Sequence, residues 1–194
     1  MMKEIFQRIW NMALPYQDKR DDKGHAQITL GFAETLIALE NGNEDIIVPA
    51  IILHDIGWSQ LSKQTISILF SKNSTKDELF SIRIQHQNES VRLARDILAD
   101  VSYPPDLSTE ILEIISQHDT REGFISKNEG LVRDADKLWR FSKVGFETDV
   151  RRSNSSIDTR CKKLENELNN PKYMYSASAR RIASEELELR KESK

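Results

Sequence analysis

The sequence has little of what marks secreted, membrane or nucleic-acid-binding proteins. It holds one cysteine, Cys161, which cannot form an internal disulfide and therefore fits a reducing cytoplasm. The N-terminus lacks the apolar run of a signal peptide. The longest apolar stretch, Ile46 to Leu53, is far shorter than the roughly 20 residues that span a bilayer. A net charge of −3 argues against dedicated nucleic-acid binding. We therefore expect a cytoplasmic protein with neither membrane nor nucleic-acid partners.

Alternating strand patterns are also scarce, and apolar residues recur at helical spacing along most of the 194 residues. The sequence therefore predicts an all-α fold, with residues 1–194 forming one helical domain. We expect its core at about 20–142 and a helical extension at about 150–194. The charged C-terminal helices have two interpretations: an outer layer on the same chain, or a surface that forms a homodimer. The predicted helices are approximately 5–13, 24–40, 45–55, 75–100, 106–118, 128–143, 156–169 and 175–192.

The helix around Ile46–Leu53 is apolar on all sides, which predicts that it is the central buried helix. Pro49 is tolerated only near the first turn of a helix, so we expect the helix to start close to it. Gly57 predicts that the helix ends directly after His54 and Asp55.

All four histidines of the chain, His25, His54, His86 and His118, lie on predicted apolar helix faces. A single histidine in such a place is more often a hydrogen-bonded core residue than a ligand. Four of four, accompanied by acidic residues that face inward, indicate one shared site. Imidazole and carboxylate are the side chains that hold a catalytic divalent cation.

The spacing of these residues fits a bundle in which successive helices each deliver a ligand to one centre. Two adjacent residues on a long regular helix cannot both face the protein core. His54 and Asp55 can both reach a metal ion only because the helix is predicted to end beside them.

The ordered pattern resembles the HD-domain superfamily of metal-dependent phosphohydrolases, over about residues 20 to 142. The resemblance implies an HD-domain-like helical bundle with additional C-terminal helices. A His-Asp pair alone is a weak signal, but the full ordered set on a helical background is specific. The matching segments are Lys23–Ala26, Ile51–Gly57, His86–Ser90 followed by Ala94–Leu98, and Asp134–Leu138.

The resemblance implies that one divalent ion is bound by His25, His54, Asp55 and Asp136. In members with two ions, residues at the places of His86 and His118 bind the second ion and the Asp55 equivalent bridges. In members with one ion, those histidines contact the substrate phosphate. We expect one firmly bound ion, with both alternatives open for the other histidines. Manganese, iron, zinc, nickel, cobalt and magnesium all suit these ligands.

Asp134 competes with Asp136 for the place of the last ligand. The family pattern puts the ligand just before a basic residue and a leucine, which here favours Asp136. Asp134 is then expected to orient a histidine or to face solvent.

The implied activity is hydrolysis of a small phosphorylated metabolite or nucleotide by a metal-activated water. Asp55 is a ligand and a candidate proton acceptor, and Asp119 is a second acid/base candidate. Lys63 and Arg140 are candidates for binding the substrate phosphate. Trp58 stands where many members have a lysine, and we expect it to cover the core or to stack on a base. The alternatives are a nucleotide phosphodiesterase or pyrophosphohydrolase, and a non-catalytic metal-stabilised regulatory module.

Overall fold

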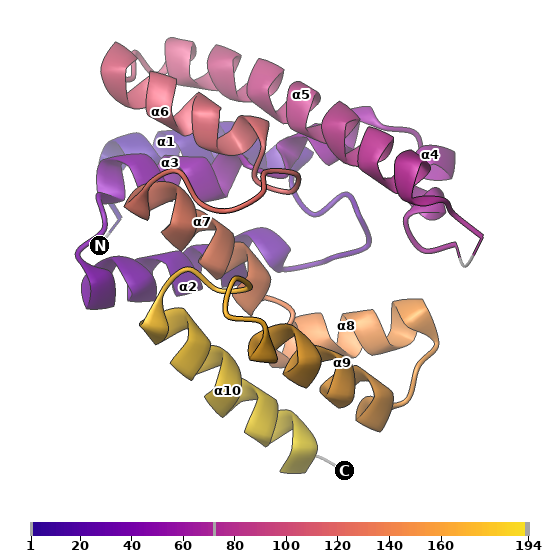
Figure 1. The fold of residues 1–194 in the computed structure, drawn as a ribbon. Coiled ribbons are helices and arrows are strands. Elements are labelled where there is room, and N and C mark those ends of the chain that lie inside the picture. Colours follow the sequence, from indigo (N-terminus) through magenta and orange to yellow (C-terminus); the bar gives the residue numbers. More distant parts are fainter. Residues whose placement is uncertain (1, 72, 193–194) are drawn as a thin grey trace.

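The computed structural model describes residues 2–71 and 73–192, and its regular elements within these ranges are all helices (Figure 1). The all-α prediction is confirmed. None of the described helices is both long enough and apolar enough to cross a membrane. The elements are α1 Glu4–Ala13, η1 Leu14–Tyr16, α2 His25–Glu40, α3 Glu44–Leu53, η2 Ile56–Gln60, α4 Lys63–Ile68, α5 Lys76–Asp100, α6 Pro105–Ser116, α7 Lys127–Leu138, α8 Lys143–Ser153, α9 Ile157–Asn169 and α10 Ala177–Glu192.

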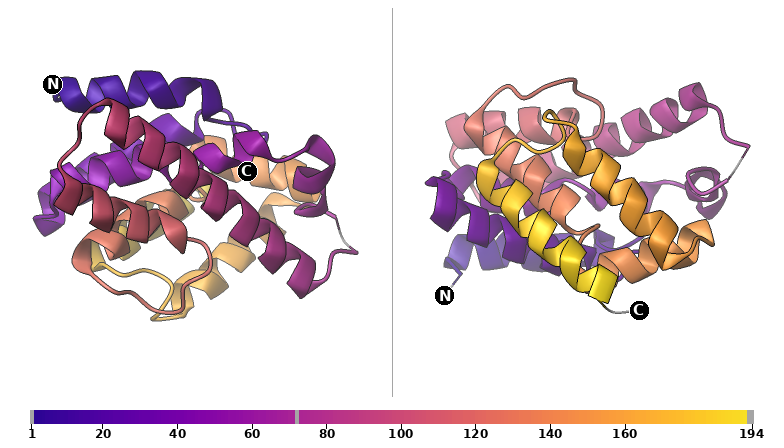
Figure 2. Two further views of the ribbon diagram at one scale, coloured as in Figure 1. Left: turned by 90° about the horizontal axis from the view of Figure 1, so that it is seen from above. Right: turned by 60° about the horizontal axis from the view of Figure 1, so that its bottom comes forward.

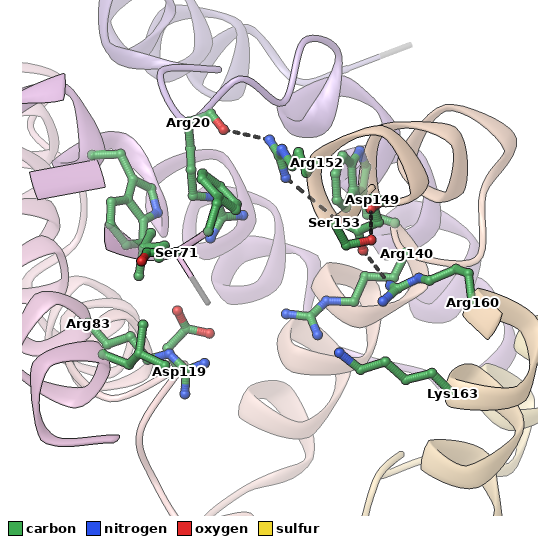
Figure 3. A pocket seen from close by; sticks show the side chains of 15 residues that line it. Arg20, Ser71, Arg83, Asp119, Arg140, Asp149, Arg152, Ser153, Arg160 and Lys163 are labelled. Atoms are coloured by element: carbon green, nitrogen blue, oxygen red, sulfur yellow. Dashed lines mark hydrogen bonds and ion pairs between the residues drawn. The ribbon is translucent and has the colours of Figure 1, made fainter. Parts of the chain in front are cut away.

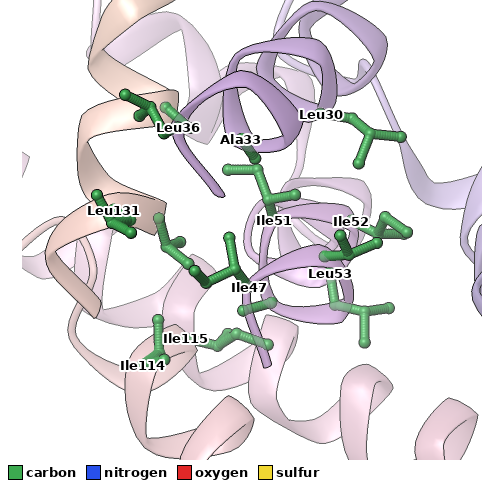
Figure 4. Packing of buried hydrophobic residues seen from close by; sticks show 14 of the residues in the cluster. Leu30, Ala33, Leu36, Ile47, Ile51, Ile52, Leu53, Ile114, Ile115 and Leu131 are labelled. Carbon is green, nitrogen blue, oxygen red and sulfur yellow. The ribbon is translucent and has the colours of Figure 1, made fainter. Parts of the chain in front are cut away.

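Helix α3 is the centre of the core, as its all-round apolar sequence predicts. It contacts α1, α2, α6 and α7, and every residue from Ile46 to Leu53 is buried. Figure 4 shows Ile47 and Ile51 among side chains of α2, α6 and α7. Each such side chain contributes about 1.5–3 kcal/mol when it is fully buried. Apolar burial therefore fixes the end of α3, from which His54 and Asp55 follow.

Pro49 lies well inside α3, so the expectation that the helix starts close to it is wrong. A proline in a helix lacks the N–H that would bond the carbonyl four residues earlier, here that of Asp45. The Tyr103 hydroxyl donates a hydrogen bond to this carbonyl oxygen at 2.6 Å. Tyr103 is itself buried, and burial raises its pKa to about 12. A tertiary contact therefore replaces the helical hydrogen bond that the proline removes.

Two helices end earlier than the sequence predicts. Helix α6 stops at Ser116, so His118 lies in the turn after it and not on a helix face. Helix α7 stops at Leu138, and a separate helix, α8, follows that we did not predict. The Ser142 hydroxyl accepts a hydrogen bond from the Gly145 N–H and caps α8. A Cβ atom on Gly145 would lie 1.8 Å from the Trp139 carbonyl oxygen, so the turn needs glycine there.

The C-terminal helices pack against the core of the same chain (Figure 2). Helix α10 contacts α2, α7 and α9, and its buried residues Ala179, Ala183 and Leu187 belong to the same apolar cluster as α3. In the structure α10 therefore lies as an outer layer on the same chain. A homodimer stays a prediction.

The contact between Tyr103 and Asp45 can be tested with a double-mutant cycle. Tyr103→Phe leaves the Asp45 carbonyl without its donor, and we expect a loss of about 1–3 kcal/mol in the free energy of unfolding. Pro49→Ala returns an N–H to the helix. In that background the same tyrosine substitution should cost about 1 kcal/mol less. Urea unfolding of the four proteins measures the difference. An equal loss of unfolding free energy in both backgrounds would show that the Tyr103 hydroxyl does not replace the missing helical hydrogen bond.

Candidate metal centre

Six side chains from five parts of the fold converge at one place. His25 begins α2, His54 and Asp55 follow α3, and His86 lies within α5; His118 follows α6, and Asp136 lies within α7. The structure brings them together in two groups, in each of which one candidate ligand atom per residue lies within 4.8 Å of the others. The first group is His25, His54, Asp55 and Asp136, and the second is Asp55, His86 and His118.

In the first group the histidine Nε2 atoms face each other and two carboxylates. The Nε2 atoms of His25 and His54 are 3.2 Å apart. The Nε2 atom of His25 lies 3.4 Å from Asp55 Oδ2 and 3.3 Å from Asp136 Oδ1. The corresponding distances from His54 are 3.6 and 3.5 Å. Four donors thus surround one small volume.

The second group uses the other oxygen of the same aspartate. Asp55 Oδ1 lies 3.3 Å from His118 Nε2 and 3.5 Å from His86 Nε2, and the two histidine Nε2 atoms are 3.3 Å apart. The two oxygens of Asp55 therefore face different groups of histidines.

Helix ends orient two of the histidines. The His54 Nδ1–H donates to the Ile51 carbonyl at 2.8 Å, and the His118 Nδ1–H donates to the Ile115 carbonyl at 2.8 Å. A neutral imidazole that donates from Nδ1 has its lone pair on Nε2. In the neutral form that binds a metal ion, both rings therefore present the Nε2 lone pair to the centre.

The position of His86 depends on the close approach of η2 to α5. A Cβ atom on Gly57 would lie 2.0 Å from the His86 carbonyl oxygen and 2.4 Å from the Ser90 backbone nitrogen. The Gly57 N–H instead donates to the Ser90 hydroxyl at 2.9 Å. The helix does end where Gly57 predicts, but the glycine has an additional role: it lets Asp55 meet His86.

Gln87, which the sequence analysis did not single out, holds the turn that carries His118. Its side chain is buried, its Oε1 accepts from the Asp119 N–H at 2.9 Å, and its Nε2 donates to the Thr120 hydroxyl at 3.1 Å. Only the fold shows that these residues, more than 30 positions apart, are neighbours.

The electrostatics of the centre reflect the crowding of its donors. Burial lowers the pKa of His54, but the charges of Asp55 and Asp136 outweigh burial and raise it to about 9. Burial likewise opposes ionisation of the two carboxylates. The neighbouring histidines, together with Arg20 beside Asp55, nevertheless hold the pKa of both acids well below the usual range. The centre thus keeps its carboxylates ionised.

The donor set fits a divalent cation. Four histidine nitrogens and two carboxylates point inward, and Asp55 Oδ2 is a buried atom that makes no hydrogen bond in the described part of the chain. Buried carboxylates without hydrogen bonds are costly unless a cation compensates them. Mixed imidazole and carboxylate ligation suits the divalent metals of hydrolytic sites.

Arg20 and Trp58 complete the centre. The Trp58 ring stacks on the His86 ring with 3.8 Å between ring centroids. It is buried, which agrees with the interpretation that it covers the core. The Arg20 guanidinium lies 5.1 Å from the Trp58 ring centroid and 3.4 Å from Asp55 Oδ2. Arg20 occupies a charged loop where nothing in the sequence distinguishes it from its neighbours.

A cavity of about 310 Å³ adjoins the centre (Figure 3). Arg20, Trp58 and Asp119 are part of its lining, and Asp119 Oδ2 lies 3.7 Å from His86 Nε2. Arg140 also lines the cavity, as its predicted role requires. Lys63 does not: it begins α4, is exposed and is absent from the lining. The basic residues that do line it are Arg20, Arg83, Arg140, Arg152, Arg160 and Lys163.

Asp134 lies outside both groups of candidate ligands. Its carboxylate is buried and accepts hydrogen bonds of 2.8 Å from the Tyr175 N–H, the Ser176 N–H and the Ser176 hydroxyl. Burial raises its pKa, against the effect of these donors. Asp134, which lies in α7, therefore holds the segment that precedes α10 in place through these hydrogen bonds. It neither faces solvent nor makes a described hydrogen bond to a histidine, so both expectations for it are wrong.

Substitution of Asp134 should mainly lower stability, whereas substitution of Asp136 should mainly lower the metal content. Asp134→Asn places an amide N–H against backbone donors, and we expect unfolding to require about 1–3 kcal/mol less with the metal content unchanged. Asp136→Asn should lower the metal content with a smaller effect on stability. Elemental analysis and chemical denaturation of both variants measure this. A loss of metal in the Asp134 variant alone would reverse the assignment.

Comparison with known proteins agrees with this geometry. The family model for the HD domain matches residues 24–140, which include all six converging side chains. Searches of curated proteins and of solved structures found no match to the chain. The matched segment covers more than half of the sequence, and the chain therefore belongs to the HD-domain family, within the superfamily of metal-dependent phosphohydrolases.

Proposed function

We propose that this protein is a metal-dependent phosphohydrolase that cleaves a phosphate ester or anhydride of a small metabolite or nucleotide. The observation that carries this proposal is the combination of a buried His/Asp centre with an adjoining cavity lined by six basic residues. Two acidic residues, Asp119 and Asp149, also line this cavity, so basic residues outnumber acidic ones there although the net charge of the chain is −3. Phosphoryl groups are the ligands that arginine clusters bind best.

His25, His54, Asp55 and Asp136 would hold one divalent ion, and His86 and His118 would share Asp55 to hold another. The opposed directions of the two Asp55 oxygens support two ions in place of the single firmly bound ion that we expected. Divalent ions bound there would lower the pKa of water and polarise the phosphoryl oxygens.

The residues of the cavity supply the remaining chemistry. Arg20 is fixed by Asp22 and Asp55, and its guanidinium would neutralise charge that develops on the phosphoryl group. Burial raises the pKa of Asp119, but His118 and His86 outweigh burial and lower it. Its ionised carboxylate, at the edge of the second group, would accept a proton. Trp58 and Trp139, both buried, would limit the access of water.

Two alternatives remain distinct in their products. A phosphodiesterase or pyrophosphohydrolase would release a nucleoside monophosphate, whereas a phosphatase releases inorganic phosphate. A regulatory module would bind metal and ligand without turnover. The complete ligand set and the adjacent Asp119 favour an enzyme. A screen of phosphate esters and nucleotides with several divalent ions, with analysis of both products, separates the three.

His54→Ala and Asp55→Asn should reduce hydrolysis of every cleaved substrate by at least about 1,000-fold, because each removes a metal ligand and an element of charge stabilisation. Asp96→Asn, an exposed carboxylate on the outer side of α5, is the matched control and should retain activity. Steady-state assays measure the change. Full activity in either centre variant would overturn the proposal.

The number of ions can be tested separately from activity. We expect elemental analysis of the wild-type protein to find two divalent ions per chain, and His118→Ala to lower this to one. His25→Ala should affect the first group instead. A wild-type protein that binds a single ion, with no change in His118→Ala, would assign His118 to the substrate.

A further inference from the structure

The part of the chain that follows the family-matched segment supplies basic residues to the cavity. Arg152 lies in α8, and Arg160 and Lys163 lie in α9, beyond the matched residues 24–140. Arg140 stands at the end of the matched segment. One wall of the cavity is therefore built from residues that metal binding does not require.

Two of these basic residues already form ion pairs with an acidic residue. Asp149 forms ion pairs with Arg152, at 3.7 Å, and with Arg160. On the side of the metal centre, Arg20 pairs with Asp22 and Asp55. Arg83, Arg140 and Lys163 line the cavity without an ion pair in the described part of the chain, and of these Arg140 and Lys163 lie on the side of α9. Their charges remain available to a ligand.

Arg140 and Lys163 lie together across the cavity from Asp119. In Figure 3 their cationic ends point into the cavity from the side of α9, whereas Asp119 and Arg83 lie on the opposite side. A phosphoryl group at the metal centre would meet Arg20 and the metal ligands. The charges of Arg140 and Lys163 would then face the rest of the substrate.

The size of the cavity limits what the rest of the substrate is. Its volume of about 310 Å³ is at the lower end of the range of small-molecule sites. Apolar lining is limited to a few side chains, among them Leu69, Phe70 and Leu79. A small ligand that meets the two unpaired cations on the side of α9 needs a second anionic group to match them.

Building on the proposed function, we propose that Arg140 and Lys163 bind a second phosphoryl group of the substrate. The enzyme then selects compact molecules with two phosphoryl groups over the corresponding monophosphates. One phosphoryl group is hydrolysed at the centre, and the other is held across the cavity. Lys163 and Arg140 are specificity-determining residues in this assignment.

The test compares matched substrates, ADP with AMP and fructose 1,6-bisphosphate with fructose 6-phosphate. We expect wild-type kcat/KM to favour at least one doubly phosphorylated member by about tenfold or more. Lys163→Met should remove about tenfold of that preference, which is the value of one charge-assisted hydrogen bond. Lys162→Met is the matched control, because Lys162 is the exposed neighbour on α9 and does not line the cavity. Arg140→Gln gives a second, independent variant whose folding is checked by thermal unfolding.

A binding measurement without turnover separates this inference from the proposed function. Inorganic tripolyphosphate is titrated into the protein in the presence of EDTA. The signal is the intrinsic tryptophan fluorescence, to which Trp58 and Trp139 in the cavity lining contribute. Weakening of about tenfold in Lys163→Met, and none in Lys162→Met, supports the inference even for a protein without hydrolytic activity. Hydrolysis with equal kcat/KM for both members of every pair, or equal tripolyphosphate binding by both lysine variants, overturns the inference and leaves the proposed function intact.

Discussion

The whole centre depends on one buried carboxylate, that of Asp55. Four histidines and Arg20 surround it, each with a nitrogen within 3.6 Å of one of its oxygens. An ionised group of this kind is unfavourable in a protein interior unless positive charge compensates it. The helices that deliver the four histidines are therefore linked through a single charge. Apolar packing around α3 sets the position of this carboxylate. Because the carboxylate is buried and ionised, it requires positive charge around it.

The sequence predicted the existence of the centre better than the details of its construction. Histidines on apolar faces and the His54-Asp55 pair carried enough information to name five of the six converging residues, whereas Asp136 was distinguished from Asp134 only by the resemblance to the family. The exact end of α6 was not predictable, because a turn with a buried histidine has the same apolar spacing as a helix. Pro49 misled the prediction of the helix start, because its compensating partner, Tyr103, is distant in sequence.

The residues that the sequence did not reveal share a physical cause. The roles of Arg20, Gln87 and Lys163 depend on where the fold points their side chains. Polar residues on loops and helix surfaces show no periodic pattern in the sequence that would indicate this. Lys63 follows the His-Asp segment in sequence, which predicted a place near the substrate, yet it lies at the start of α4 and outside the cavity lining. Proximity in sequence was a poor guide to the cavity, whereas inward-facing periodicity was a good guide to the candidate metal ligands.

The hydrogen bonds of Asp134 have a consequence for the modular organisation of the chain. The family model ends at residue 140, but the donors to this buried acid come from Tyr175 and Ser176. A chain cut after the matched segment would leave an uncompensated acid within the helix that carries Asp136. The family-matched part is thus not self-sufficient in this protein. Its last metal-facing helix has come to depend on residues that lie outside it.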